Sequence, residues 1–162
     1  MKLQHENLPV VSCPFSFIHR NLMREVCNMF SFSTVEEFSE LRETVRQKLN
    51  QLLVTGVEPL FVAVNEAVNN AIFHGNKQDK AKKVYLAITS SPGEVRVIVR
   101  DEGGGFSKMA NAQPDELRES GRGLEIIGLC VDQYYYNAQP SEIVLIKKVA
   151  VSPLESKRRV VV

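Results

Sequence analysis

One helical segment of the sequence carries polar side chains that could act on a phosphorylated ligand. Glu66, Asn70 and His74 lie four residues apart, so successive ones are rotated by only about 40° around a helix and share one stripe. A carboxylate there could take a proton from a hydroxyl or water, and the Asn70 amide oxygen suits a magnesium ion already carried by phosphates. The same spacing also fits an exposed polar pair on a helix surface. For His74 we favour a capping or packing role over contact with phosphate.

A second segment, residues 101–105, follows a predicted strand and reads DEGGG. Asp101 stands at the strand end, and the glycines after it leave the backbone open to a flat ligand. Its carboxylate could accept a hydrogen bond from an exocyclic amine such as that of adenine, a contact that the carbonyl of guanine would not make. The alternative is a flexible glycine turn.

A third segment, residues 121–124, reads GRGL and opens a short apolar pattern typical of a helix. Free backbone N–H groups and the positive end of the helix dipole suit phosphate oxygens there, and Arg122 could add a charge-assisted hydrogen bond. An ordinary turn before a helix is the alternative. The sequence has no GxxxxGK[ST] and no GxGxxG followed by a distant acidic residue, which excludes Walker-type and Rossmann sites.

Two longer helices are predicted from apolar spacing. Residues 34–53 read as an amphipathic helix, with Thr34 and Glu37 spaced as an N-terminal capping box. Residues 58–74 read as a second helix that carries the first polar segment and ends at Gly75.

Alternating apolar residues predict strands at 84–89 and 95–100, joined by a turn at 90–93 into a hairpin. Two further strands, at 134–137 and 143–148, follow the GRGL helix.

Two parts of the chain are less regular. After the DEGGG segment, the polar stretch that reaches Ser120 lacks periodicity and is long for an idle loop, so we expect a functional lid. Residues 24–33 fit either a strand or a short helix, and we favour the strand.

Composition indicates one globular domain. The chain has 162 residues with a formal charge of +1 and 44% apolar residues, which argues against intrinsic disorder and against a dedicated nucleic-acid binder. No apolar run approaches the roughly 20 residues that span a membrane. Three widely spaced cysteines, Cys13, Cys27 and Cys130, form no CxxC pair and favour a reduced cytoplasm.

The three segments, in this order, resemble the motifs of the Bergerat-fold ATPases, the superfamily of gyrase, heat-shock chaperones, histidine kinases and mismatch-repair proteins. The wording AVNEAVNNAIFHGN at 63–76, VRDEGGGF at 99–106 and SGRGLEII at 120–127 looks most like the bacterial anti-sigma-factor serine kinases. The similarity covers roughly residues 25–148. It implies a two-layer α/β sandwich, in which helices cover one face of a mixed, mainly antiparallel sheet and ATP lies between the second helix and the lid.

The resemblance also implies roles for individual residues. Glu66 would be the base that receives the proton of the substrate hydroxyl, Asn70 the magnesium ligand and Asp101 the carboxylate that reads adenine. The remaining motif residues would bind ATP by shaping the nucleotide cleft and lid: Gly103, Gly105, Gly121, Arg122, Gly123 and Leu124.

The family's partners are proteins. Such domains sequester a sigma factor and phosphorylate a serine on an anti-anti-sigma protein, and they often form homodimers. Two alternatives stay open: a non-catalytic module gated by nucleotide, and a detached histidine-kinase catalytic domain, for which His19 would be the upstream candidate. We expect an extension at residues 1–23, an ATP-binding domain at 24–150 and a tail at 151–162.

Overall fold

The computed structural model describes residues 28–112 and 121–150. Five strands form one sheet in the order β1-β2-β3-β5-β4, and every pairing between the described strands is antiparallel. The strands are β1 (Asn28–Phe32), β2 (Val84–Ser91), β3 (Glu94–Asp101), β4 (Gln133–Asn137) and β5 (Glu142–Lys148).

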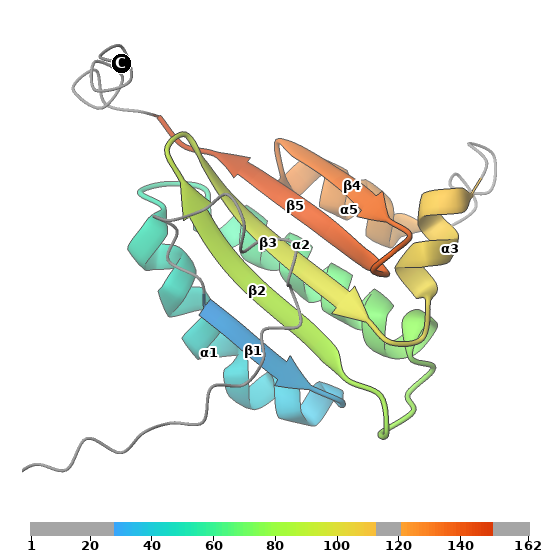
Figure 1. The fold of residues 1–162 in the computed structure, drawn as a ribbon. Helices are drawn as coiled ribbons and strands as arrows, with labels where there is room; N and C mark the ends of the chain where they lie inside the picture. The colour runs from blue at the N-terminus through green and yellow to red at the C-terminus, as the bar shows by residue number, and fades with distance from the viewer. Residues whose placement is uncertain (1–27, 113–120, 151–162) are drawn as a thin grey trace, which may run out of the picture.

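The helices α1, α2 and α5 lie together behind the sheet in Figure 1. The predicted two-layer α/β sandwich is therefore confirmed. The described helices are α1 (Val35–Leu52), α2 (Val57–Asn69), η2 (Asn70–Gly75), α3 (Gly105–Asn111) and α5 (Arg122–Cys130).

The first predicted helix is confirmed as α1, and so is its cap. The Thr34 side chain accepts a hydrogen bond from the Glu37 N–H at 3.2 Å. The Glu37 carboxylate in turn accepts from the Ser33 N–H at 2.7 Å, one residue before the cap. Both bonds hold the start of α1 against the end of β1.

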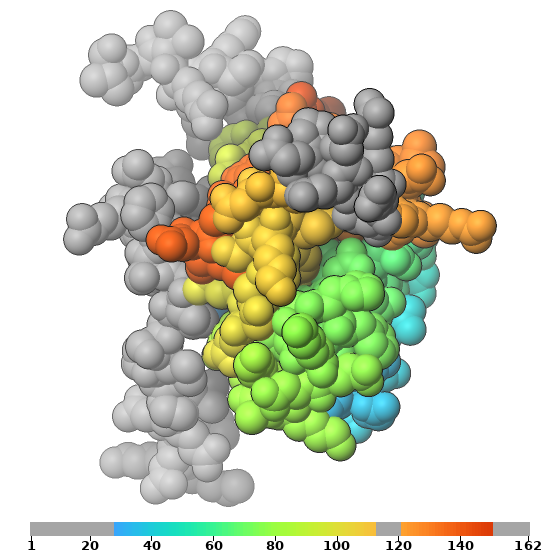
Figure 2. Space-filling model, turned by 90° about the vertical axis from the view of Figure 1, so that its right-hand side faces the viewer, coloured from blue at the N-terminus to red at the C-terminus, as the bar shows by residue number. Residues whose placement is uncertain are grey.

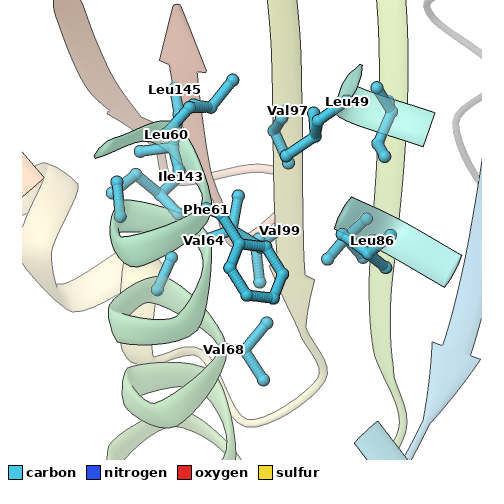
Figure 3. Close-up of a cluster of buried hydrophobic side chains, with 14 of the residues drawn as sticks. Leu49, Leu60, Phe61, Val64, Val68, Leu86, Val97, Val99, Ile143 and Leu145 are labelled. Atoms are coloured by element: carbon cyan, nitrogen blue, oxygen red, sulfur yellow. The ribbon is translucent and has the colours of Figure 1, made fainter. Parts of the chain in front are cut away.

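The core fills the space between the helices and the sheet. Leu60, Val64 and Val68 from α2 meet strand residues such as Leu86 and Val99, all of them fully buried (Figure 3). Seven apolar side chains of α2 and η2 are buried: Leu60, Phe61, Val64, Ala67, Val68, Ala71 and Ile72. This packing fixes the position of the polar stripe along the rim of the core.

The second predicted helix differs from expectation at its end. Its last five residues, 70–74, form the π-helix η2 together with Gly75. The Asn76 N–H donates to the Ala71 carbonyl at 2.7 Å, a bond spanning five residues. The wider turn brings Gly75 against the strand end that carries Asp101.

The hairpin is confirmed, but its strands extend to Ser91 and from Glu94, so only Pro92 and Gly93 remain in the turn. The expected strand near the N-terminus is β1, and residues 24–27 of that prediction lie outside the described residues. The expectation of a lid without regular structure was wrong at its start, because residues 105–111 form the helix α3.

Other predictions fall on residues outside the described part of the chain. These are the extension at 1–23, the tail at 151–162, the lid between 113 and 120, and the residues His19, Cys13 and Cys27. Among the described helices, none is long and apolar enough to cross a membrane.

Candidate functional site

The carboxylate and amide of the first segment face the start of α5. A Cβ atom placed on Gly123 would lie 3.3 Å from Oε2 of Glu66 and 3.7 Å from Nδ2 of Asn70. Both side chains are half-buried, and no hydrogen bond among the described residues uses either side chain. The structure thus brings Glu66, Asn70 and Gly123 together and leaves both polar groups available.

Asp101 is buried, with 3% of its surface exposed. Its Oδ1 accepts a hydrogen bond from the Gly105 N–H at 2.9 Å, and its Oδ2 accepts from the Phe106 N–H at 3.0 Å. The Ser141 hydroxyl donates to the same Oδ2 at 2.9 Å. These bonds hold α3 at the end of β3 and occupy three of the roughly four acceptor positions of a carboxylate.

Three glycines let two backbone segments touch beside Asp101. A Cβ on Gly103 would lie 1.8 Å from the carbonyl oxygen of Gly75, and one on Gly105 would lie 2.5 Å from the Cα of Gly75. A Cβ on Gly75 would itself lie 2.8 Å from Cγ of Asp101. Close approach, rather than flexibility, therefore explains the glycines at 103 and 105.

Two polar residues to which the sequence analysis gave no role, the buried Asn76 and the half-buried Ser141, hold this end of the site. Asn76 donates to the Lys83 carbonyl and accepts from the Glu102 N–H, both at 3.0 Å. The Ser141 hydroxyl accepts from the Ser107 N–H at 2.9 Å while it donates to Asp101. Asn76 is the last residue of the motif segment at 63–76, whereas Ser141 lies outside the motifs, 40 residues from Asp101.

A cavity of about 390 Å³ opens between η2, α3, α5 and β4. Figure 2 views the molecule from the side on which α3 lies, next to the residues of η2 and the loop that follows them. The lining surface of the cavity is mostly apolar and includes Phe106, Met109, Leu124 and Tyr136. The other lining residues are Asn70, His74, Gly105 and Lys108. His74 thus lines the cavity, and this leaves its chemical role untested.

The GRGL segment contributes Leu124 to the lining of this cavity. Gly121 caps α5 with a φ of 82°, a left-handed conformation that favours glycine. Arg122 is exposed. Three of the predicted site residues line the cavity, namely Asn70, Gly105 and Leu124. The other six are not among its lining residues: Glu66, Asp101, Gly103, Gly121, Arg122 and Gly123. In residues 28–112 and 121–150, no three His, Cys, Asp or Glu side chains converge on a metal position.

The Tyr136 hydroxyl is buried and, within the described part of the chain, has no hydrogen-bond partner. Burial, with a smaller effect of Tyr134, raises the pKa of Tyr136, so the hydroxyl stays protonated at neutral pH. An unpaired buried hydroxyl costs free energy, whereas the ring stacks on Phe106 with centroids 6.0 Å apart.

Replacing Tyr136 by phenylalanine should therefore stabilise the protein. We expect a gain of about 1 kcal/mol, or roughly 2–4 °C in Tm, because the ring contact is kept while the unpaired hydroxyl is removed. Thermal unfolding followed by circular dichroism measures this. A lower Tm for Tyr136→Phe would show that the hydroxyl is paired in solution.

Comparison with known proteins agrees with this geometry. Residues 33–147 match the family model described as histidine kinase-like ATPase domain. An anti-sigma F factor of Shouchella clausii (strain KSM-K16) is 35% identical over 113 residues, which cover 65% of this chain and 77% of that protein. One from Geobacillus thermodenitrificans (strain NG80-2) is 32% identical over 119 residues, 68% and 82% of the two chains.

The anti-sigma F factor of Bacillus subtilis (strain 168) is 36% identical over 83 residues, which cover 48% of this chain and 57% of that protein. The matched region thus spans little more than half of this relative. The family match covers the described helices, strands β2 to β4, all of β5 except Lys148, and all three motif segments. The chain therefore belongs to the anti-sigma-factor kinase family, a branch of the histidine kinase-like ATPases.

Proposed function

We propose that the protein binds Mg-ATP in the cavity beside η2 and α3 and transfers a phosphoryl group to a protein serine. The observation that carries this proposal is the convergence of Glu66, Asn70 and Gly123 next to a mostly apolar cavity in a histidine kinase-like ATPase fold. The apolar lining suits a nucleobase, and the glycine at 123 keeps the space in front of Glu66 and Asn70 free of a side chain. The ATP-binding unit would be residues 24–150.

Each motif residue has a task in this proposal. Asp101, held by Ser141 and the start of α3, keeps one acceptor position for the exocyclic amine of adenine. Asn70 offers its amide oxygen to the magnesium ion, and Arg122 with the first N–H groups of α5 binds phosphate oxygens. Glu66 receives the proton of the attacking hydroxyl. The bound nucleotide supplies the phosphoryl group.

The partners are inferred from the relatives, which are named anti-sigma F factors. We infer that this chain binds a sigma factor and phosphorylates a serine on an anti-anti-sigma protein. Regulation would then depend on which partner is bound and whether that serine is phosphorylated.

The test is phosphotransfer in a purified system. The full chain is incubated with Mg-ATP and an anti-anti-sigma domain from the same genome, and the product is analysed by mass spectrometry. One phosphate on a serine of the partner is the expected result. Tight partner binding without transfer to any serine would instead indicate a nucleotide-gated binding module.

Asp101→Asn should weaken ATP binding by about 10- to 100-fold. A charged hydrogen bond contributes about 1.5–3 kcal/mol. The side-chain NH2 group of the variant cannot accept a hydrogen bond, and it would face groups that donate to Asp101 in the wild type. Calorimetry with ATP and GTP measures the loss, and Asp79→Asn on the exposed loop is the matched control. Equal ATP affinity in Asp101→Asn and the wild type would contradict the adenine-reading role.

A further inference from the structure

Strands β2 and β3 stop pairing at the position of Asp101. The last pair of their ladder is Val84 opposite Asp101, so the next pair in the same register would be Lys83 opposite Glu102. Beyond Asp101, however, side-chain groups bind the backbone of both strands. The ladder therefore gives way to side-chain bonds beside the residue that we assign to adenine.

The Asn76 side chain bridges the two strands at this point. Its Nδ2 donates to the Lys83 carbonyl and its Oδ1 accepts from the Glu102 N–H, both at 3.0 Å. A side-chain amide offers the same kinds of donor and acceptor as a peptide group, so it can stand in for a backbone partner of each strand. Asn76 is 1% exposed, and its loss would leave buried backbone groups without a partner.

The Glu102 carboxylate makes a second link across the same gap. Its Oε2 accepts from the Lys83 N–H at 2.7 Å, and its Oε1 accepts from the Tyr85 hydroxyl at 3.0 Å. Glu102 is exposed, so water competes for these bonds, whereas the Asn76 bridge lies in the interior, where a hydrogen bond is stronger. The Asn76 bridge is therefore the main link between the strands beyond Asp101.

The bridge also ties η2 to the glycine segment. Asn76 follows Gly75, the residue whose backbone touches Gly103. Figure 1 shows the end of β3, the start of β2 and the chain after α2 at the same end of the sheet. Close packing of glycines leaves no room for side chains but gives no directed bond, so the two bonds of Asn76 supply the direction.

Asp101 is held by the peptide groups on both of its sides. Its own N–H donates to the Ser141 carbonyl at 3.1 Å. The N–H of the next residue, Glu102, donates to Asn76. Because a peptide group is planar, fixing the Glu102 N–H restricts rotation about the Cα–C bond of Asp101. The direction in which the Asp101 side chain leaves the backbone is thereby set.

We propose that Asn76 is a positioning residue for Asp101, and that the affinity for ATP depends on this buried amide although the amide does not contact the nucleotide. Asn76 is not among the residues that line the cavity of about 390 Å³, so its effect on the ligand passes through Asp101. This inference rests on the proposed function, in which Asp101 binds adenine.

A double-mutant cycle tests the coupling. Calorimetry measures ATP affinity for the wild type, Asn76→Ala, Asp101→Asn and the double variant, at a temperature at which circular dichroism shows all four to be folded. We expect Asn76→Ala to weaken ATP binding by about tenfold in the wild-type background. In the Asp101→Asn background the same change should cost less than about twofold, because residues that act through one contact are not additive.

Val45→Ala is the matched control for a loss of stability alone. Val45 is buried in α1 and does not line the cavity, so its replacement lowers Tm without touching the bonds of Asp101. We expect it to bind ATP as the wild type does. If Asn76→Ala does not fold, Asn76→Asp takes its place in the cycle, because it keeps the acceptor for the Glu102 N–H and loses only the donor to the Lys83 carbonyl.

Three results of the cycle would overturn the proposal. They are wild-type ATP affinity in the Asn76 variant, equal losses in both Asp101 backgrounds, and a loss in Val45→Ala as large as that in the Asn76 variant. The last two would indicate a purely structural role.

A measurement without nucleotide separates this proposal from the proposed function. The Gly105 and Phe106 N–H groups donate to Asp101 at 2.9 and 3.0 Å, so their amide proton shifts in NMR spectra report the position of its carboxylate. Both shifts should change in Asn76→Ala and stay the same in Val45→Ala. Unchanged shifts in Asn76→Ala would overturn the positioning role. Changed shifts in a protein whose wild type binds no ATP would support that role and contradict the proposed function.

Discussion

Replacing Glu66 by glutamine is expected to slow phosphotransfer to the partner serine by about 10²- to 10⁴-fold while ATP affinity stays unchanged. Glutamine keeps the size of the side chain and its place beside Gly123, but it cannot take the proton of the hydroxyl. Most of the catalysis of phosphoryl transfer comes from positioning and charge neutralisation, which the variant keeps, so a residual rate remains. Single-turnover transfer and calorimetry with ATP measure the two quantities.

The matched control for this experiment is Glu125→Gln. Glu125 is an exposed carboxylate in the first turn of α5, so its replacement changes the same charge near the same motif without touching Glu66. Its transfer rate should equal that of the wild type. Unchanged turnover in Glu66→Gln, or an equal loss in both variants, would contradict the role of Glu66 as base.

Local sequence signals predicted the elements that carry the site. The capping pair at Thr34 and Glu37 marked the start of α1, and the apolar spacing of α2 placed Glu66 and Asn70 on the rim of the core. These features depend on residues three or four apart, which a sequence displays directly. The three motif segments were found for the same reason.

The parts that sequence reasoning missed depend on contacts between distant residues. Helix α3 begins at two glycines, which disfavour helices, and it forms because the Asp101 carboxylate and Ser141 bind its first N–H groups. The π-helical turn of η2 likewise accompanies the contact between Gly75 and Gly103. Neither contact has a local pattern in the sequence.

The outer sheet face shows a second reason for such errors. The alternation in β3 places Ile98, which has a near neighbour of arginine type on each side, on the sheet face opposite the main core, where it pairs with Val144. Yet Ile98 is buried there. A period of two tells which face a residue occupies, but it cannot tell whether that face is covered.

Gly103→Ala is expected to lower the free energy of unfolding by about 2–3 kcal/mol, or roughly 4–12 °C in Tm. The added Cβ would lie 1.8 Å from the Gly75 carbonyl oxygen and 2.8 Å from the Asn76 backbone nitrogen. Both obstacles are backbone atoms, so no side-chain rotation relieves the clash. The backbone must separate, which moves η2 away from Asp101 and should also weaken ATP binding.

Gly104→Ala separates this steric effect from ordinary backbone strain. Gly104 has a φ of 78°, but a Cβ there would meet nothing within 4 Å. Its replacement should cost about 1 kcal/mol, from the left-handed conformation alone. Urea unfolding of both variants, followed by circular dichroism, gives the two free energies. If Gly103→Ala were as stable as Gly104→Ala, the close contact between the glycine loop and η2 would not exist in solution, and the account of the site built on it would fail.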